Sequence, residues 1–79
     1  MNEEMLIVKY NPFAKESLVY ISRKGEITQA EVASNLSMFI SGLEEIANAT
    51  NITLIRIDAP NYLIEEVQSK LPNLEVEGI

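Results

Sequence analysis

The chain contains 79 residues, with no cysteine, no histidine and a formal net charge of −6 at pH 7. A chain of this length forms a single domain, here residues 1–79, and without cysteine it is not held together by disulfides. The missing thiol and imidazole remove the cysteine nucleophile, the commonest general base and nearly all zinc sites, so we do not expect an enzyme.

The charges are distributed unevenly along the chain. Residues 1–24 contain four basic and three acidic residues, whereas residues 25–79 contain two basic and nine acidic residues. Nucleic-acid binding requires several clustered Lys or Arg side chains that displace the counterions of phosphate, and the sequence has no such cluster. We therefore expect no direct contact with nucleic acid.

Neither a membrane span nor a secretory leader is predicted. No stretch approaches the roughly 18 consecutive apolar residues of a spanning helix. The chain starts with Met1-Asn2-Glu3-Glu4, which lacks the basic start and the apolar run of a signal peptide. We therefore expect a cytoplasmic protein that does not bind membranes.

Two short strands are predicted first in chain order. Residues 5–10 and 18–22 are rich in Val, Ile, Leu and Tyr, and Asn11-Pro12 ends the first run with the residues typical of a turn. Because residues 11–17 form a hairpin connection between them, we expect the two strands to pair antiparallel.

A long helix is predicted to begin at Thr28. Thr28 and Glu31 have the spacing of a capping box, and Ile27 can pack on Val32 as a hydrophobic staple. Apolar residues then recur every three or four positions, as in a helix with one buried stripe. These residues are Val32, Ala33, Leu36, Phe39, Ile40, Leu43, Ile46 and Ala47. The helix is expected to end between residues 48 and 51.

Three further elements are predicted after the long helix. Residues 52–58 are rich in β-branched residues, which indicates a central strand. A second helix follows, with Asp58 or Asn61 as its N-cap and Pro72 as its limit. Residues 74–77 alternate between apolar and acidic side chains, which is typical of an edge strand with one exposed face.

The predicted fold is a small α+β two-layer sandwich with the element order β-β-α-β-α-β. Crossover connections between parallel strands are right-handed and usually join neighbours. We therefore expect a four-stranded mixed sheet of order 2-1-3-4, in which only the second strand is antiparallel, with both helices on one face. This topology resembles one half of a ribonuclease-H-like or actin-like domain, and no sequence motif adds to the resemblance.

The resemblance suggests a test for a metal-dependent nuclease, because such enzymes gather carboxylates at the ends of their strands. Asp58 lies at a suitable strand end, but the end of the first strand carries Lys9, Tyr10 and Asn11 in place of a carboxylate. Two divalent ions need several converging acids. The three glycines are isolated, so no phosphate-binding loop is predicted. We assign no catalytic, metal or cofactor residue.

The outer face of the long helix is the most unusual feature of the sequence. An exposed helix face is ordinarily rich in Lys, Glu and Arg, whereas this face combines small polar residues with one Met. Positions 34, 38, 41 and 45 follow the spacing along which two helices can pack. The candidate interaction residues are Ser34, Ser37, Met38, Ser41 and Glu45. The alternative is an ordinary exposed face without a partner.

Aromatic residues near the first two strands are secondary candidates. Tyr10 and Tyr20 can lie on the helix-free face of the sheet, where they and Lys9 would form a patch for a partner; the alternative is that they close a small core. Phe13, in the hairpin connection, either packs back on the sheet or anchors a partner.

Acidic pairs near the end of the chain are the remaining candidates. Glu65 and Glu66, together with Glu75 and Glu77, are ordinary exposed acids unless the second helix and the last strand turn them to one side. In that case the surface can imitate a phosphate backbone or attract a basic protein.

The leading hypothesis is a small non-enzymatic interaction or regulatory module that forms a homodimer. It would bind another protein, or a second copy of itself, through the open sheet face or the outer side of the long helix. One alternative is an acidic nucleic-acid mimic that inhibits a DNA- or RNA-binding protein, and another is a reduced ribonuclease-H-like nuclease. No cofactor or small-molecule substrate is inferred. Whether a dimer uses the long helix or the last strand stays open.

Overall fold

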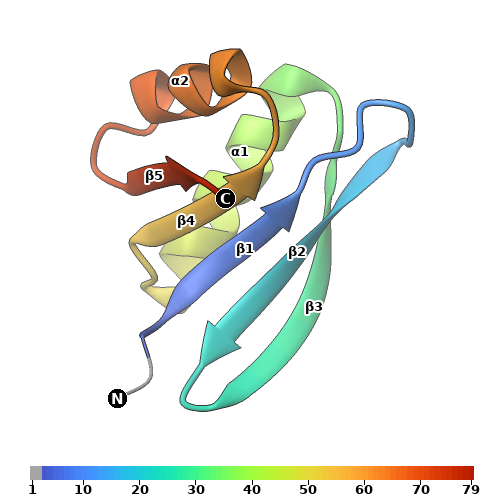
Figure 1. Cartoon of the computed structure of the whole chain (residues 1–79). Helices are drawn as coiled ribbons and strands as arrows, with labels where there is room; N and C mark the ends of the chain where they lie inside the picture. Colours follow the sequence, from blue (N-terminus) through green and yellow to red (C-terminus); the bar gives the residue numbers. More distant parts are fainter. Residues whose placement is uncertain (1–2) are drawn as a thin grey trace.

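Short apolar runs pair into one mixed sheet, and two helices cover one of its faces (Figure 1). The computed structural model describes residues 3–79. The strands are β1 (Met5–Lys9), β2 (Glu16–Arg23), β3 (Glu26–Ala33), β4 (Leu54–Asp58) and β5 (Glu75–Gly78), and the helices are α1 (Leu36–Thr50) and α2 (Asn61–Lys70). Within the described residues, neither helix is long and apolar enough to cross a membrane.

The strand order is β3-β2-β1-β4-β5. β1 pairs antiparallel with β2 and parallel with β4, β2 pairs antiparallel with β3, and β4 pairs parallel with β5. The predicted α+β class with one mixed sheet and two helices is confirmed. The predicted number of four strands is wrong, because β3 adds a fifth strand outside β2 and becomes one edge of the sheet.

Residues 28–33 form a strand, although the sequence predicts the start of the long helix there. The cause is the turn between β2 and β3, where Lys24 and Gly25 both have positive φ angles, of 51° and 80°. A two-residue turn of this kind has the twist that a tight β-hairpin requires, and glycine adopts it without a steric penalty. The eight-pair ladder between β2 and β3 overrides the local capping box of Thr28 and Glu31.

The helix boundaries are set by backbone geometry rather than by the capping side chains that were predicted. Asn35 is the N-cap of α1, and Asn51 ends that helix in the left-handed conformation with φ of 58°. Asparagine tolerates this conformation better than most residues. Pro60 is the N-cap of α2, which has no side-chain cap hydrogen bond, so the predicted capping by Asp58 or Asn61 is wrong. The fixed φ of Pro60 already suits the first turn of a helix.

The core lies between the sheet and the two helices. Side chains alternate across a strand, so Leu6 and Val8 of β1 point to the helices, whereas Ile7 and Lys9 lie on the helix-free face. The buried core residues are Leu6, Val8, Val19, Val32, Ile55, Ile57 and Val76 from the sheet, Phe39, Leu43, Ala47, Leu63 and Val67 from the helices, and Ile52 and Leu71 from the connecting segments. Gln68 fastens α2 to β5, because its amide accepts from the Val76 N–H at 3.0 Å and donates to the Leu74 carbonyl at 2.8 Å.

Helix α1 packs on the edge strand β3 at Gly42. A Cβ atom built on Gly42 would lie 2.9 Å from Cγ1 of Val32 and 3.2 Å from its Cβ. Real Cβ atoms do not approach a neighbour that closely, and the branched Val32 side chain is stiff. The absence of a side chain at Gly42 therefore allows the helix to lie close beneath β3.

Replacing Gly42 by alanine tests this close approach. Alanine favours the helix by about 1 kcal/mol over glycine, but crowding against Val32 costs about 1–3 kcal/mol. We expect a net loss of about 1 kcal/mol in the free energy of unfolding by urea denaturation. In a Val32→Ala background, which removes Cγ1, Gly42→Ala should cost less, with a coupling of about 1 kcal/mol. An equal effect in both backgrounds would contradict the packing argument.

Candidate interaction surface

Strand β3 presents an unpaired backbone edge eight residues long. The two-residue turn makes Arg23 and Glu26 the closing pair of the hairpin, and this pair exchanges hydrogen bonds. Hydrogen-bonded pairs alternate along an antiparallel ladder, so every second residue of β3 directs its N–H and C=O away from β2. These outward residues are Ile27, Gln29, Glu31 and Ala33. In residues 3–79, no strand pairs with this edge.

A groove of about 450 Å³ runs between β3 and α1. It is lined by Glu31, Val32 and Ala33 from the strand and by Ser37, Met38, Ser41, Gly42, Glu45 and Ile46 from the helix. We call these residues, together with the outward edge of β3, the β3–α1 face. Four of the five helix residues predicted to form an interaction surface lie on it.

The β3–α1 face has exposed apolar side chains and few charged ones. Met38 is 60 % exposed, and Ile27 on the adjoining edge is 66 % exposed. Among the described residues that line the groove, only Glu31 and Glu45 carry a charge. An exposed apolar side chain beside an unpaired strand edge is a combination that natural proteins usually cover or blunt.

The fifth predicted residue, Ser34, does not belong to this face. It lies in the bend between β3 and α1 and is only 7 % exposed, so its assignment to the outer side of the helix is wrong. The cause is the later helix start, which leaves residue 34 outside the helix. Ser34 Oγ lies 2.8 Å from Ser17 Oγ, and Ser17 Oγ accepts the Asn11 N–H at 2.9 Å. The Ser34 N–H donates to the Lys15 carbonyl at 2.9 Å.

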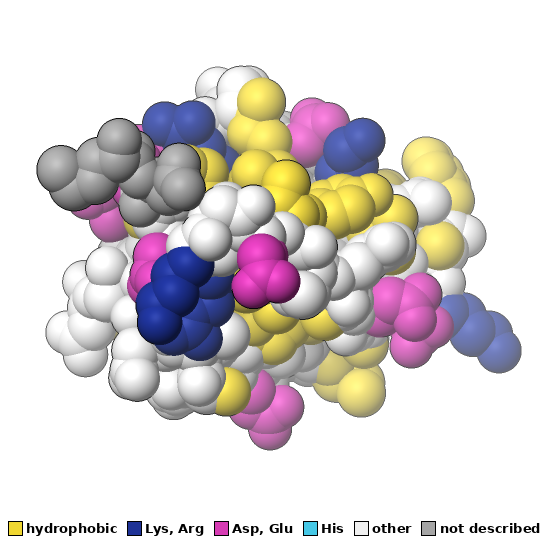
Figure 2. All heavy atoms as spheres, turned by 90° about the horizontal axis from the view of Figure 1, so that it is seen from below, with side chains coloured by type: hydrophobic (Ala, Val, Ile, Leu, Met, Phe, Trp, Pro, Cys, Tyr) yellow, Lys and Arg dark blue, Asp and Glu magenta, His cyan; other side chains and the backbone are white. Residues whose placement is uncertain are grey.

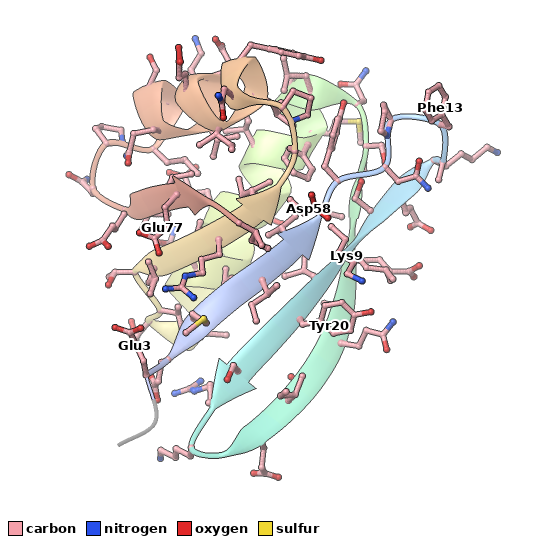
Figure 3. The ribbon with its side chains drawn as sticks, in the orientation of Figure 1. Glu3, Lys9, Phe13, Tyr20, Asp58 and Glu77 are labelled. Atoms are coloured by element: carbon pink, nitrogen blue, oxygen red, sulfur yellow. The ribbon has the colours of Figure 1, made fainter. Side chains whose placement is uncertain are left out.

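The helix-free side of the sheet is a second exposed surface. Tyr20 of β2 lies between Ile7 of β1 and Gln29 of β3 in the ladders, and its side chain points away from the helices, as does that of Lys9 (Figure 3). Figure 2 shows the molecule from below, from the end that carries the turn between β2 and β3, where hydrophobic side chains lie among charged ones. Tyr20 and Lys9 thus occupy the face that the sequence suggests for them.

The other two aromatic candidates, Tyr10 and Phe13, lie in different environments. Tyr10 packs against Phe39 of α1 with ring centroids 5.0 Å apart and an interplanar angle of 61°, so it belongs to the core side. Phe13 lies in the loop between β1 and β2, is 97 % exposed and points away from the sheet (Figure 3). Of the two alternatives for Phe13, packing back on the sheet does not occur.

The acidic candidates do not form one surface. Glu75 and Glu77 of β5 are opposite Leu54 and Arg56 of β4 and lie on the helix-free face, whereas Glu65 and Glu66 belong to α2 on the other face of the sheet (Figure 1).

One of these acids also has a cationic partner. The Arg56 Nε donates to Glu77 Oε1 at 2.7 Å. This hydrogen bond and the charge of Glu77 raise the pKa of Arg56 above its ordinary value. Glu77 is therefore not a free negative charge that could imitate a phosphate.

The carboxylate that a nuclease would need does not belong to a cluster of acids in the described residues. Asp58 ends β4 opposite Lys9 of β1, and both are labelled in Figure 3. Among residues 3–79, no group of three or more His, Cys, Asp or Glu side chains is placed to hold a metal ion.

Comparison with known proteins identifies the fold only. No family model matches the chain, and no curated protein matches its sequence. The chain is an α+β protein with a five-stranded mixed sheet, and part of a solved structure is similar to it. Its backbone is similar to that of YeaZ from Pseudomonas aeruginosa, with a TM-score of 0.61 and 8 % sequence identity over 99 % of this chain. The match covers 44 % of the YeaZ chain, so this chain spans less than half of that length.

The buried serine pair beneath the face yields a stability prediction. Ser17→Ala would leave the Ser34 hydroxyl and the Asn11 N–H without their partner, at a cost of about 1–3 kcal/mol. Ser37→Ala is the matched control, because its hydroxyl bonds to Asn35 at an exposed position and should cost less than about 0.5 kcal/mol. Urea denaturation measures both variants. If both variants lose the same free energy of unfolding, the buried serine pair contributes no more to stability than an exposed hydrogen bond.

Proposed function

We propose that the chain is a small, non-enzymatic, cytoplasmic protein-interaction module that forms a homodimer through the β3–α1 face. The observation that carries this proposal is the unpaired edge of β3 beside a groove lined by small and apolar side chains of α1. Strand edges and helix grooves are the two surfaces through which folded proteins most often recognise extended or helical segments.

The size of the chain supports self-association. A domain of 79 residues without disulfides buries a smaller fraction of its unfolded surface than a larger domain does, and its stability is correspondingly low. Covering Met38 and Ile27 against a partner would remove exposed apolar area from water, which stabilises the folded chain. The small side chains of Ser37 and Ser41 permit a close approach to the helix.

The acidic-mimic alternative has less support. A phosphate mimic needs several free carboxylates on one side, whereas Glu65 and Glu66 lie on the opposite side of the sheet from Glu75 and Glu77, and Glu77 is paired with Arg56. The reduced nuclease lacks a cluster of acids around Asp58 in the described residues. The β3–α1 face therefore supports an interaction module better than either alternative.

Met38→Glu tests the proposed surface. Burying an unpaired carboxylate in an interface is costly, so we expect dimerisation to weaken at least about tenfold, which corresponds to roughly 1.4 kcal/mol. Tyr62→Glu is the matched control, because Tyr62 is 71 % exposed on α2 and lies outside the β3–α1 face.

Sedimentation velocity over a concentration series measures both variants. The proposal expects Tyr62→Glu to behave as the unmodified chain does. If the two variants dimerise equally well, the β3–α1 face is not the interface.

A further inference from the structure

We infer that two copies of the chain join by pairing their β3 edges antiparallel about a twofold axis, which extends each five-stranded sheet into the other. This inference rests on the proposed homodimer and specifies how it forms. Its basis is that, in one register, the outward residues of β3 in one copy are complementary in polarity to those of β3 in the second copy.

Strand β3 suits such pairing better than the other edge. β3 has eight residues, whereas β5 has four, Glu75–Gly78. Both acids of β5 lie on the same face, so two β5 edges would bring four carboxylates together, of which only the two Glu77 carboxylates are paired with Arg56. Like charges opposite one another destabilise a sheet. The outward positions of β3 contain one acid, Glu31, among two apolar residues and one amide.

The charge pattern of β3 selects the register. When the axis passes beside Ala30, Gln29 is opposite Glu31 of the second copy, and Ile27 is opposite Ala33 of the second copy. In this register the Gln29 amide lies opposite a carboxylate, and the apolar Ile27 lies opposite another apolar side chain. When the axis passes beside Gln29, the exposed Ile27 is opposite a carboxylate. When it passes beside Glu31, two carboxylates are directly opposed.

The same axis brings the two long helices together. A twofold axis perpendicular to the sheet keeps both helix layers on one side, and α1 lies beneath β3 through the contact of Gly42 with Val32. The groove of each copy is then closed by the α1 helix of the other. The small Ser37 and Ser41 side chains leave room for this approach, and Met38 provides apolar area to cover.

Proline at position 29 tests the use of the edge. The N–H of Gln29 points away from β2 and makes no ladder bond, so Gln29→Pro removes only a donor that the second copy would use. We expect at least about a tenfold weaker dimer by sedimentation equilibrium, with an unchanged far-ultraviolet circular dichroism spectrum. Gln29→Ala keeps the N–H and should remain dimeric.

Single cysteines test the register, because the natural chain has none. In the proposed register, Ala30 and its copy form a non-hydrogen-bonded pair with Cα atoms about 4.5 Å apart, within disulfide reach. Ala30→Cys should form a disulfide-linked dimer on mild oxidation. Gln29→Cys and Glu31→Cys should not, because each is offset from its own copy by two residues, or about 7 Å along the strand.

The outcomes separate this inference from the function on which it rests. An unmodified chain that is monomeric at all concentrations overturns both. A dimer that persists in Gln29→Pro, with no cross-link in Ala30→Cys, overturns the pairing of β3 and leaves the homodimer. Cross-linking of Gln29→Cys or Glu31→Cys in place of Ala30→Cys overturns the register. If Gln29→Pro does not fold, the cysteine series alone decides.

Discussion

The turn at Lys24 and Gly25 determines most of what is distinctive in this fold. Its positive φ angles close a two-residue hairpin, and that hairpin fixes both the register of β2 with β3 and the residues of β3 that face outward. Because β3 is the last strand on its side of the sheet, the turn also determines which backbone groups are left unpaired. The position of α1 then follows from the contact of Gly42 with Val32.

Helix α1 has two sides with different roles, one in the core and one in the groove. One side of the helix, with Phe39 and Leu43, is buried against the sheet, and the other side lines a groove with β3. The Ser17 and Ser34 hydroxyls join the bend before the helix to β2, and the Asn11 N–H, which donates to Ser17 Oγ, links them to the loop between β1 and β2. The groove therefore lies between a strand that is paired with β2 over eight positions and a helix whose opposite side is buried. Such a surface needs little ordering when a partner binds, and this lowers the entropic cost of association.

Much of the fold follows from local patterns in the sequence, and the failures have physical causes. β1, β4 and the antiparallel β2 could be predicted because their apolar runs are short and bounded by turn residues or proline. The start of α1 could not be predicted in the same way. Thr28 and Glu31 have the spacing of a capping box, yet residues 26–33 also pair with β2 over eight positions, and that pairing depends on a turn whose importance is not visible from the capping pattern. The feature of the sequence that indicates this hairpin is Lys24-Gly25, a turn-forming pair that follows one β-forming run and precedes another.

The candidate surface could likewise be predicted only in part from the sequence. Met38, Ser41 and Glu45 could be placed on an outer helix face from their spacing alone. Ser34 could not be excluded, because its burial depends on Ser17, which is 17 positions earlier in the chain. The sequence pattern does not indicate the strand half of the surface, because it predicts residues 28–33 as helix. Sequence periodicity finds a surface on one element, but a surface shared by two elements depends on their packing.

The proposed self-association through a largely apolar surface is tested by sedimentation equilibrium of the unmodified chain at low and high salt. Salt screens interactions between exposed charges and leaves apolar contacts largely unaffected. We expect a dimer at both salt concentrations. A monomer at both would contradict it, and a dimer that dissociates in high salt would show that charge, rather than the β3–α1 face, holds the two copies together.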